Sequence, residues 1–375
     1  MESVLRYYII AGEASGDLHG SALMSGLFRA DATCEIRFWG GDRMASAGGT
    51  LVRHYGGTAV MGFTEVLGKA GSILSNLRFC RKDILSWNPD AVILIDYPGF
   101  NLRIARFAKS HGFKVFYYIP PKVWARGHRR ISLLDRNTDR VFSIFPFEYD
   151  YLSQRKVKVT YAGNPLVDMV DNHGYSPVLG GAPTIALLPG SRRAELKFLM
   201  PRFAELERLV RSDSRFDGYQ LVIAASPSMK TGDYLSYLPS GTSVKVIEGR
   251  TYDILRQADA AVVCSGTASL EAALIGTPQV VCYGFSALTY ALARILVSGI
   301  KYISLANLIT DRLLFKELIQ NEASPQAIFS CLAELLPGSG FREEMLSGYR
   351  ELRARLGEGG AADRVAAAIV AETKN

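Results

Sequence analysis

The chain is poor in the residues that form disulfides and bind metals. Its 375 residues include only five cysteines and five histidines. The number of cysteines is odd, no two of them have C-x-x-C spacing, and no two histidines have H-x-H or H-x-x-x-H spacing. These absences argue against a disulfide framework and against a metal held by the protein. We therefore expect no metal and no cofactor.

Long apolar runs and a leader sequence are also missing. No uninterrupted apolar stretch reaches the roughly 18–20 residues that cross a bilayer. The first ten residues lack the order of basic, apolar and small residues that marks a signal peptide. We expect a cytoplasmic protein whose chain opens with a strand.

Acidic residues are in the minority, and the formal net charge is +7. The basic residues cluster at Lys122–Arg130, without the aromatic-rich pattern of RNA-binding proteins beside them. This balance favours phosphorylated substrates or anionic membrane headgroups over nucleic acid as partners.

What the chain does contain is a repeated alternation of strand and helix. Short apolar strands are expected at Tyr7–Ala11, Ile36–Trp39, Ala91–Ile95, Lys114–Ile119, Arg140–Ile144, Val157–Tyr161, Ile185–Leu188, Gln220–Ala224, Ser243–Ile247, Ala260–Cys264 and Gln279–Tyr283. Helices fill most of the gaps between them. The alternation predicts an α/β fold of doubly wound parallel sheets.

The alternation is interrupted by a polar, Gly- and Pro-rich stretch, Asp171–Pro183, which we expect to be a linker. It would separate an N-terminal domain, residues 1–172, from a C-terminal domain, residues 173–340. The helical tail 341–375 would cap the second domain or pack back on the first. Two such domains would face a cleft, and ligands bind outside the carboxyl ends of the strands. Residues that directly follow strands are therefore the candidates for chemistry.

One such turn lies near the middle of the chain, after the strand Ile185–Leu188. Gly190 helps to end the strand, and Ser191 is placed to cap a helix that begins at Arg192 or Arg193. Free N–H groups at a helix N-terminus and two guanidinium groups suit a diphosphate. The alternative is an ordinary turn with surface arginines.

A second turn follows the strand Ala260–Cys264. The residues whose N–H groups and hydroxyls suit a phosphate are Ser265, Gly266, Thr267 and Ala268. Glu271, about one helical turn further on, suits two ribose hydroxyls, although a capping arrangement would also place an acid there. No D-x-D pair occurs in the chain, so a departing diphosphate would be neutralised by helix N-termini and arginine.

Two acidic turns lie in the first half. Ala11–Asp17 is not a G-x-G-x-x-G turn, and its Glu13 and Asp17 suit sugar hydroxyls unless the segment is only a tight turn with Asp17 in the first turn of the helix. Asp96 directly follows the strand Ala91–Ile95, where partial desolvation would raise its pKa toward the range of a general base. The alternative is that Asp96 only holds the turn that follows it.

The segment Val60–Leu74 is apolar but is interrupted by three glycines. Glycine makes a poor rigid helix, so the segment is either a mobile flap that meets lipid or part of the core. Its apolar members include Met61, Phe63, Val66 and Leu67.

Taken together and in order, these pieces resemble the lipid-A-disaccharide synthase family. The matching segments are Ala11–Asp17, Val60–Val66, Ile95–Asn101, Pro121–Trp124, Phe145–Glu148, Gly163–Leu166, Leu188–Arg192 with Glu195, Ser265–Ala268 with Glu271, and Leu305–Asn307. The resemblance covers most of the chain. One departure is Arg126, which stands where many relatives have a second tryptophan.

The resemblance implies a two-domain glycosyltransferase of the GT-B type that acts in lipid A synthesis. Such enzymes join UDP-2,3-diacylglucosamine to 2,3-diacylglucosamine 1-phosphate (lipid X), and release UDP. Their partners are these two lipids and the inner face of the cytoplasmic membrane, with which they associate peripherally. A UDP-GlcNAc 2-epimerase-like soluble isomerase and a non-catalytic nucleotide-sugar sensor are the competing interpretations.

The resemblance also implies roles for residues. Asp96 would be the base in an inverting transfer, and Arg192 would stabilise the leaving diphosphate with Ser191 and the 265–268 turn. Glu271 would hold the ribose, and Asn307 would lie near the phosphates. Further substrate contacts are expected from Glu13, Ser15, Gly16, Asn101 and Gly190. Acyl chains and membrane would meet Met61, Phe63, Val66 and Leu67.

Overall fold

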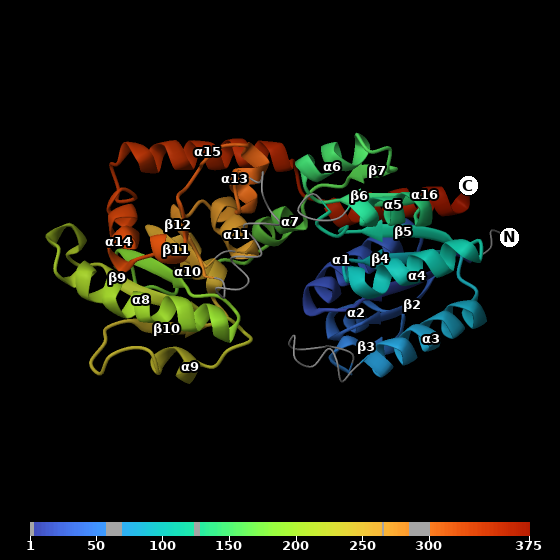
Figure 1. Ribbon diagram of the computed structural model, residues 1–375, viewed down its shortest axis with the longest axis horizontal. Coiled ribbons are helices and arrows are strands. Elements are labelled where there is room, and N and C mark those ends of the chain that lie inside the picture. Colours follow the sequence, from blue (N-terminus) through green and yellow to red (C-terminus); the bar gives the residue numbers. More distant parts are fainter. Residues whose placement is uncertain (1–3, 58–69, 124–127, 265, 285–300) are drawn as a thin grey trace. The chain divides into compact units, whose positions relative to one another are not determined.

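The chain forms two compact units that each contain one parallel sheet. The structure is a computed structural model that describes residues 4–57, 70–123, 128–264, 266–284 and 301–375. The first unit comprises residues 1–165 and 358–375, and the second comprises residues 166–357. Helices cover both faces of each sheet (Figure 1). The expected α/β fold of two doubly wound, Rossmann-like sheets is confirmed.

The first unit contains a seven-stranded sheet in the order β3-β2-β1-β4-β5-β6-β7, with every pair parallel. Its strands are β1 (Arg6–Ala11), β2 (Glu35–Gly40), β3 (Thr50–His54), β4 (Ala91–Ile95), β5 (Lys114–Tyr118), β6 (Arg140–Ser143) and β7 (Val159–Tyr161). Its helices are α1 (Ala14–Ala30), α2 (Asp42–Ala47), α3 (Ala70–Trp87), α4 (Pro98–Ser110), α5 (His128–Asn137), α6 (Pro146–Ser153) and α16 (Ala361–Lys374). The strand order reverses direction between β1 and β4, which makes that point the topological switch.

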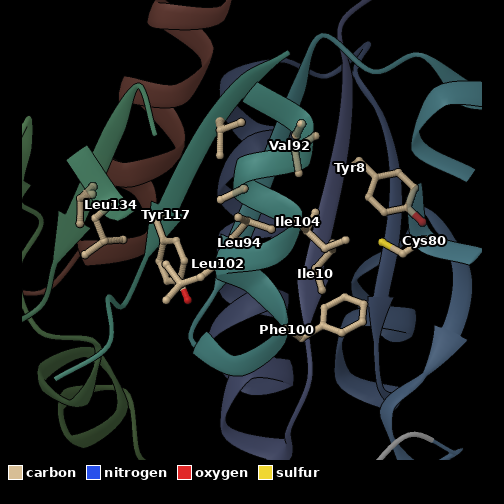
Figure 2. Close-up of a cluster of buried hydrophobic side chains, with 14 of the residues drawn as sticks. Tyr8, Ile10, Cys80, Val92, Leu94, Phe100, Leu102, Ile104, Tyr117 and Leu134 are labelled. Carbon is tan, nitrogen blue, oxygen red and sulfur yellow. The ribbon is translucent and has the colours of Figure 1, made fainter. Parts of the chain in front are cut away.

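The central strands are apolar on both faces because helices cover both faces. All five residues of β4 are buried, and β1 is buried from Tyr7 onward. Figure 2 shows side chains from β1, β4 and β5 meeting those of α3, α4 and α5 in one core. This packing fixes the positions of the turns that follow β1 and β4.

The C-terminal helix α16 belongs to the first unit, where it packs on α1. The contact is close at Gly26 of α1, where a Cβ atom would lie 3.0 Å from the Cβ of Ala366. The Arg364 guanidinium also donates to the Ala162 carbonyl at 3.0 Å. The helical tail 341–375 is therefore shared between the units. Helix α15 (Gly340–Leu356) belongs to the second unit, and only α16 packs on the first.

The second unit contains a six-stranded parallel sheet in the order β10-β9-β8-β11-β12-β13. Its strands are β8 (Thr184–Leu188), β9 (Gln220–Ala225), β10 (Lys245–Glu248), β11 (Ala260–Cys264), β12 (Gln279–Tyr283) and β13 (Glu317–Ile319). Its other helices are α7 (Pro165–Asp171), α8 (Arg193–Arg211), α9 (Thr231–Leu235), α10 (Thr251–Gln257), α11 (Thr267–Ile275), α13 (Leu305–Thr310) and α14 (Pro325–Ala333). Here the switch point lies between β8 and β11.

The expected linker Asp171–Pro183 is bound to the second unit. The N–H of Ser176 donates to the Asp253 carboxylate at 2.7 Å, and the N–H of Val178 donates to Gln257 Oε1 at 3.0 Å. Asp171 forms an ion pair with Arg353 of α15. These contacts explain why the boundary lies at 165/166 instead of the expected 172/173.

Candidate active site

The second unit has a pocket of about 300 Å³ at its switch point. The turns after β8, β9 and β11 form its walls together with the first residues of α10 and α11, as expected for an open parallel sheet. Its lining includes Gly190, Ser191, Arg192, Glu195, Ser226, Thr251, Gly266, Thr267, Ala268 and Glu271. The two turns singled out in the sequence thus meet in one cavity.

The start of α8 is capped by Glu195 and not, as expected, by Ser191. Glu195 Oε2 accepts hydrogen bonds from the N–H groups of Ser191 and Arg192 at 2.8 and 3.2 Å. Gly190 permits this arrangement, because its φ is +103° and a Cβ there would lie 2.3 Å from Glu195 Oε2. The expectation that these N–H groups are free for a diphosphate is therefore wrong, since the chain's own carboxylate binds them.

Arg192 is the positively charged residue that lines the pocket. Its side chain is 80% exposed, and its Nη1 lies 3.0 Å from Glu195 Oε1. Arg192 lines the pocket, whereas Arg193 is not among the lining residues. Of the two arginines, Arg192 is therefore the one placed to meet a ligand in the cavity.

Backbone N–H groups at the N-terminus of α11 are the hydrogen-bond donors on the other side of the pocket. Among the described residues, no side chain caps the first turn of this helix. Gly266 precedes it with a φ of +149°, a conformation that L side chains rarely adopt. Thr267 and Ala268 both line the pocket. Ser265, also expected here, lies outside the described residues.

Glu271 lies in the same pocket and is held by a tyrosine that the sequence interpretation missed. The Tyr252 hydroxyl donates to Glu271 Oε1 at 3.0 Å. Burial raises the pKa of Glu271, and this hydrogen bond partly offsets the effect. Tyr252 is in turn packed against the His173 ring, with 5.1 Å between the ring centroids. A tyrosine one residue into α10 gives no local signal of this role.

Asn307 does not line the pocket, contrary to the sequence expectation. Its side chain is fully buried and donates to the Phe315 carbonyl at 3.1 Å and to Glu317 at 2.9 Å. Its Oδ1 accepts from the N–H of Leu314 at 2.8 Å. These bonds engage both ends of the amide and give Asn307 a structural role.

In the first unit, Asp96 directly follows β4 at the switch point. Asp96 and Tyr97 have φ angles of +45° and +48°. Two consecutive non-glycine residues in the left-handed region are energetically costly, and such strain is concentrated at functional sites. The Asp96 carbonyl accepts from the Tyr117 hydroxyl at 2.7 Å and from Asn101 Nδ2 at 2.8 Å.

The side chain of Asn101 is fully buried and holds this turn in place by hydrogen bonds. Besides Asp96, its Nδ2 also donates to the Ile95 carbonyl at 3.1 Å. The expected direct contact between Asn101 and substrate is not supported by this geometry. Asn101 instead holds the main chain that carries Asp96.

The Asp96 carboxyl group, at the carboxyl edge of the first sheet, has a raised pKa. Burial raises its pKa, and the negative charge of Glu13, just after β1, raises it further. The Tyr97 N–H and the Lys122 ammonium oppose this shift. A carboxylate whose pKa is raised in this way suits proton abstraction from a hydroxyl.

The rest of the first turn has both exposed and structural residues. Glu13 and Ser15 are exposed, whereas Gly16 is buried with its Cβ position 3.2 Å from the Cβ of Ala11. Asp17 accepts hydrogen bonds from the N–H groups of Gly41 at 2.7 Å and Met44 at 3.1 Å. Asp17 therefore fixes the start of α2, and the expectation that it binds sugar hydroxyls is wrong because its carboxylate is buried and already bound. Glu13 is the acid of this turn that remains exposed.

Comparison with known proteins identifies the family. A family model described as lipid-A-disaccharide synthetase matches residues 7–364. A lipid-A-disaccharide synthase of Geobacter sulfurreducens is 36% identical over 376 aligned positions, which cover 97% of this chain and 96% of that protein. One from Myxococcus xanthus is 37% identical over 374 positions, 97% of each.

The chain belongs to the lipid-A-disaccharide synthetase family.

Solved structures with the same fold are more distant in sequence. The calicheamicin glycosyltransferase CalG4 has a TM-score of 0.62 at 15% identity, covering 100% of this chain and 98% of that chain. A UDP-GlcNAc 2-epimerase of Neisseria meningitidis, solved with UDP-GlcNAc bound, has a TM-score of 0.63 at 14% identity, covering 99% and 100%. At these identities the likeness establishes the GT-B fold of this lipid-A-disaccharide synthetase family member and not its substrate.

The sequence also supports predictions about metal binding and membrane contact in this family member. In the described part of the chain, no group of three or more His, Cys, Asp or Glu side chains is arranged to hold a metal ion. No described helix is both long and apolar enough to span a bilayer. The residues expected to meet acyl chains, Met61, Phe63, Val66 and Leu67, lie outside the described residues, as does Arg126.

Proposed function

We propose that this chain is an inverting glycosyltransferase that joins UDP-2,3-diacylglucosamine to 2,3-diacylglucosamine 1-phosphate. The products would be lipid A disaccharide 1-phosphate and UDP. Membership of the family supports this activity. The observation that carries the proposal is the pocket at the switch point of the second unit. There, a cation and a partly buried acid meet a helix N-terminus to which no described side chain gives a cap.

The pocket would hold the UDP portion of the donor. Arg192 and the N–H groups of Thr267 and Ala268 would meet the diphosphate, since guanidinium groups and helix N-termini bind phosphate oxygens. Glu271, kept in place by Tyr252, would accept hydrogen bonds from the ribose hydroxyls. As the sugar leaves, these donors would stabilise the negative charge that develops on UDP.

Asp96 would act as the base toward the acceptor. Its carboxylate would take the proton of the 6-hydroxyl while the oxygen attacks the anomeric carbon of the donor. The bond from that carbon to the UDP oxygen would break on the opposite face, which inverts the configuration. Glu13 would orient sugar hydroxyls next to Asp96, because both follow neighbouring strands of the sheet.

We further propose that the protein acts in the cytoplasm, bound peripherally to the inner face of the cytoplasmic membrane. Both substrates carry acyl chains, and exposing that apolar surface to water costs about 25 cal/mol per Å². Working at a bilayer surface would avoid this cost.

The test is a transfer assay with both lipids and no added metal, which should yield UDP and a disaccharide. Asp96→Asn should lower kcat by about 10²–10³-fold with little change in Tm. Arg192→Ala should weaken UDP binding in calorimetry, and Arg193→Ala, which alters a neighbour outside the pocket, should not. Near-full activity of Asp96→Asn would remove Asp96 from the role of base.

The same preparation separates the competing isomerase. Conversion of UDP-GlcNAc alone into UDP-ManNAc would contradict the transferase proposal. Binding of UDP without turnover of either substrate set would indicate a sensor instead.

A further inference from the structure

The first unit contains a small cavity at the carboxyl edge of its sheet, beside the Asp96 turn. Its volume is about 10 Å³, which admits one group of the size of a water molecule. Trp39 of β2, Arg53 of β3, Asn76 of α3 and Tyr97 are among the residues that line it, and none of the lining residues is acidic. The cavity therefore combines a cation with an amide in a space for a single atom group.

A shift in strand register places Arg53 at this cavity. The pairing of β3 with β2 shifts by one residue, so that Trp39 lies opposite Arg53. Shifts of the β-bulge type redirect side chains and are common next to active sites. The Arg53 guanidinium lies over the rings of Trp39 and Phe79, 5.6 and 5.7 Å from their centroids. Trp39 is itself held in place, because its Nε1 donates to the Tyr8 hydroxyl at 2.9 Å.

Two polar side chains of the cavity have no partner in the described part of the chain. No described carboxylate forms an ion pair with Arg53, and no described group accepts a hydrogen bond from its guanidinium. Asn76 is only 9% exposed, and its side-chain amide makes no hydrogen bond to a described residue. Buried polar groups are nearly always hydrogen-bonded. A cation and a buried amide that both lack partners therefore indicate a site for an anionic oxygen.

The cavity lies next to the proposed base. Gly12 and Tyr97, which both line it, are the chain neighbours of Glu13 and Asp96. A Cβ on residue 12 would lie 2.3 Å from Cδ1 of Tyr97, so only glycine lets the ring pack here. In a hexosamine 1-phosphate, the carbons that carry the phosphate and the 6-hydroxymethyl group flank the ring oxygen. An acceptor with its 6-hydroxyl at Asp96 would therefore hold its phosphate within one sugar ring of that carboxylate.

We propose that Arg53 and Asn76 bind the 1-phosphate of the acceptor, with one phosphate oxygen in the cavity that they line. The inference rests on the proposed function and deepens it, because it names the residues that distinguish this acceptor from the same lipid without phosphate. Arg53 supplies a charge-assisted hydrogen bond and Asn76 a neutral one. The small volume suits one oxygen and excludes the sugar itself.

The test is calorimetric binding of two lipids to the full chain in detergent micelles. One is 2,3-diacylglucosamine 1-phosphate, and the other is 2,3-diacylglucosamine without the phosphate. A hydrogen bond to a charged group changes affinity by about 10–100-fold, so the wild type should prefer the phosphorylated lipid by that factor. Arg53→Gln should remove most of this preference and leave the affinity for the lipid without phosphate unchanged.

A second variant keeps the arginine on its aromatic rings. Asn76→Asp is nearly isosteric and adds a carboxylate to the cavity that Arg53 lines. This charge should pair with the guanidinium and repel the phosphate, so the preference should again be lost. Arg43→Gln is the matched control, because it removes the same charge from an exposed residue of α2 that does not line the cavity. It should keep the full preference.

The outcomes are separable because binding is measured without turnover. A preference that survives in both Arg53→Gln and Asn76→Asp would overturn the proposal and leave the cavity as a place for one bound water. Equal loss in Arg43→Gln would assign the effect to net charge and would also contradict it. Equal binding of the two lipids by the wild type would refute this inference alone, whereas binding of neither would refute the acceptor named in the proposed function.

Discussion

At the scale of single residues, the Asp96 turn combines a strained main chain with a destabilised charge. Burial and the charge of Glu13 both disfavour the carboxylate form, which is the form that a base must have. Because folding raises this pKa, the protonated form of Asp96 adds to the stability of the folded state at low pH. That contribution is lost as the pH rises through the raised pKa. Asp96→Asn should consequently not lower Tm at neutral pH, as expected of a residue retained for chemistry.

The acid limb of the pH–rate profile tests the influence of Glu13. Activity should fall as pH drops through the raised pKa of Asp96, because the carboxylate becomes protonated. Glu13→Gln removes a negative neighbour, so the limb in kcat/KM should move to lower pH. Ser15→Ala, an uncharged change in the same turn, should leave the limb where it is. An unmoved limb in Glu13→Gln would show that the two acids are not coupled.

Side-chain roles are only partly predictable from the sequence. Asp96, Arg192 and Glu271 can be singled out because polar residues after buried parallel strands fall at the ligand-binding edge of a sheet. The roles of Glu195 and Asn307 escape such reasoning for one physical cause. Whether a carboxylate folds back on its own helix, or an amide is saturated by distant carbonyls, depends on tertiary contacts that no local pattern records.

At the scale of elements, fully buried strands are the most predictable. The expected bounds of β4, β11 and β12 agree with the structure to the residue, because helices on both faces make these strands continuous apolar runs. The short strands β3 and β13 are missed by the sequence pattern, since they are only partly buried and lie at sheet edges.

The contact between α1 and α16 gives a prediction at this scale. A Cβ at residue 26 would lie 3.0 Å from the Cβ of Ala366, so the bulk added by Gly26→Val should force the two helices apart. Such overpacking costs about 1–3 kcal/mol, which should appear as a lower unfolding free energy in denaturant. Gly71→Val, where nothing lies within 4 Å, is the control. Equal stability of both variants would contradict the tight packing.

At the scale of the whole molecule, each unit has its own sheet, and the described residues that line the proposed UDP pocket all belong to the second unit. A ligand that binds only the folded state stabilises it by about 2.7 kcal/mol at a hundred times Kd. UDP should therefore slow amide hydrogen exchange in residues 166–357 and leave the core strands of the first unit unchanged. Arg192→Ala should require more UDP for the same protection. Equal protection in β4 would contradict this assignment.

The docking of α16 on α1 also has a consequence for synthesis of the protein. The ribosome completes the second unit, residues 166–357, before it releases the last helix of the first. Until then, the face of α1 around Gly26 is uncovered while the rest of that unit has already emerged. The first unit is thus begun first but completed last. Until α16 docks, the uncovered face of α1 is open to aggregation.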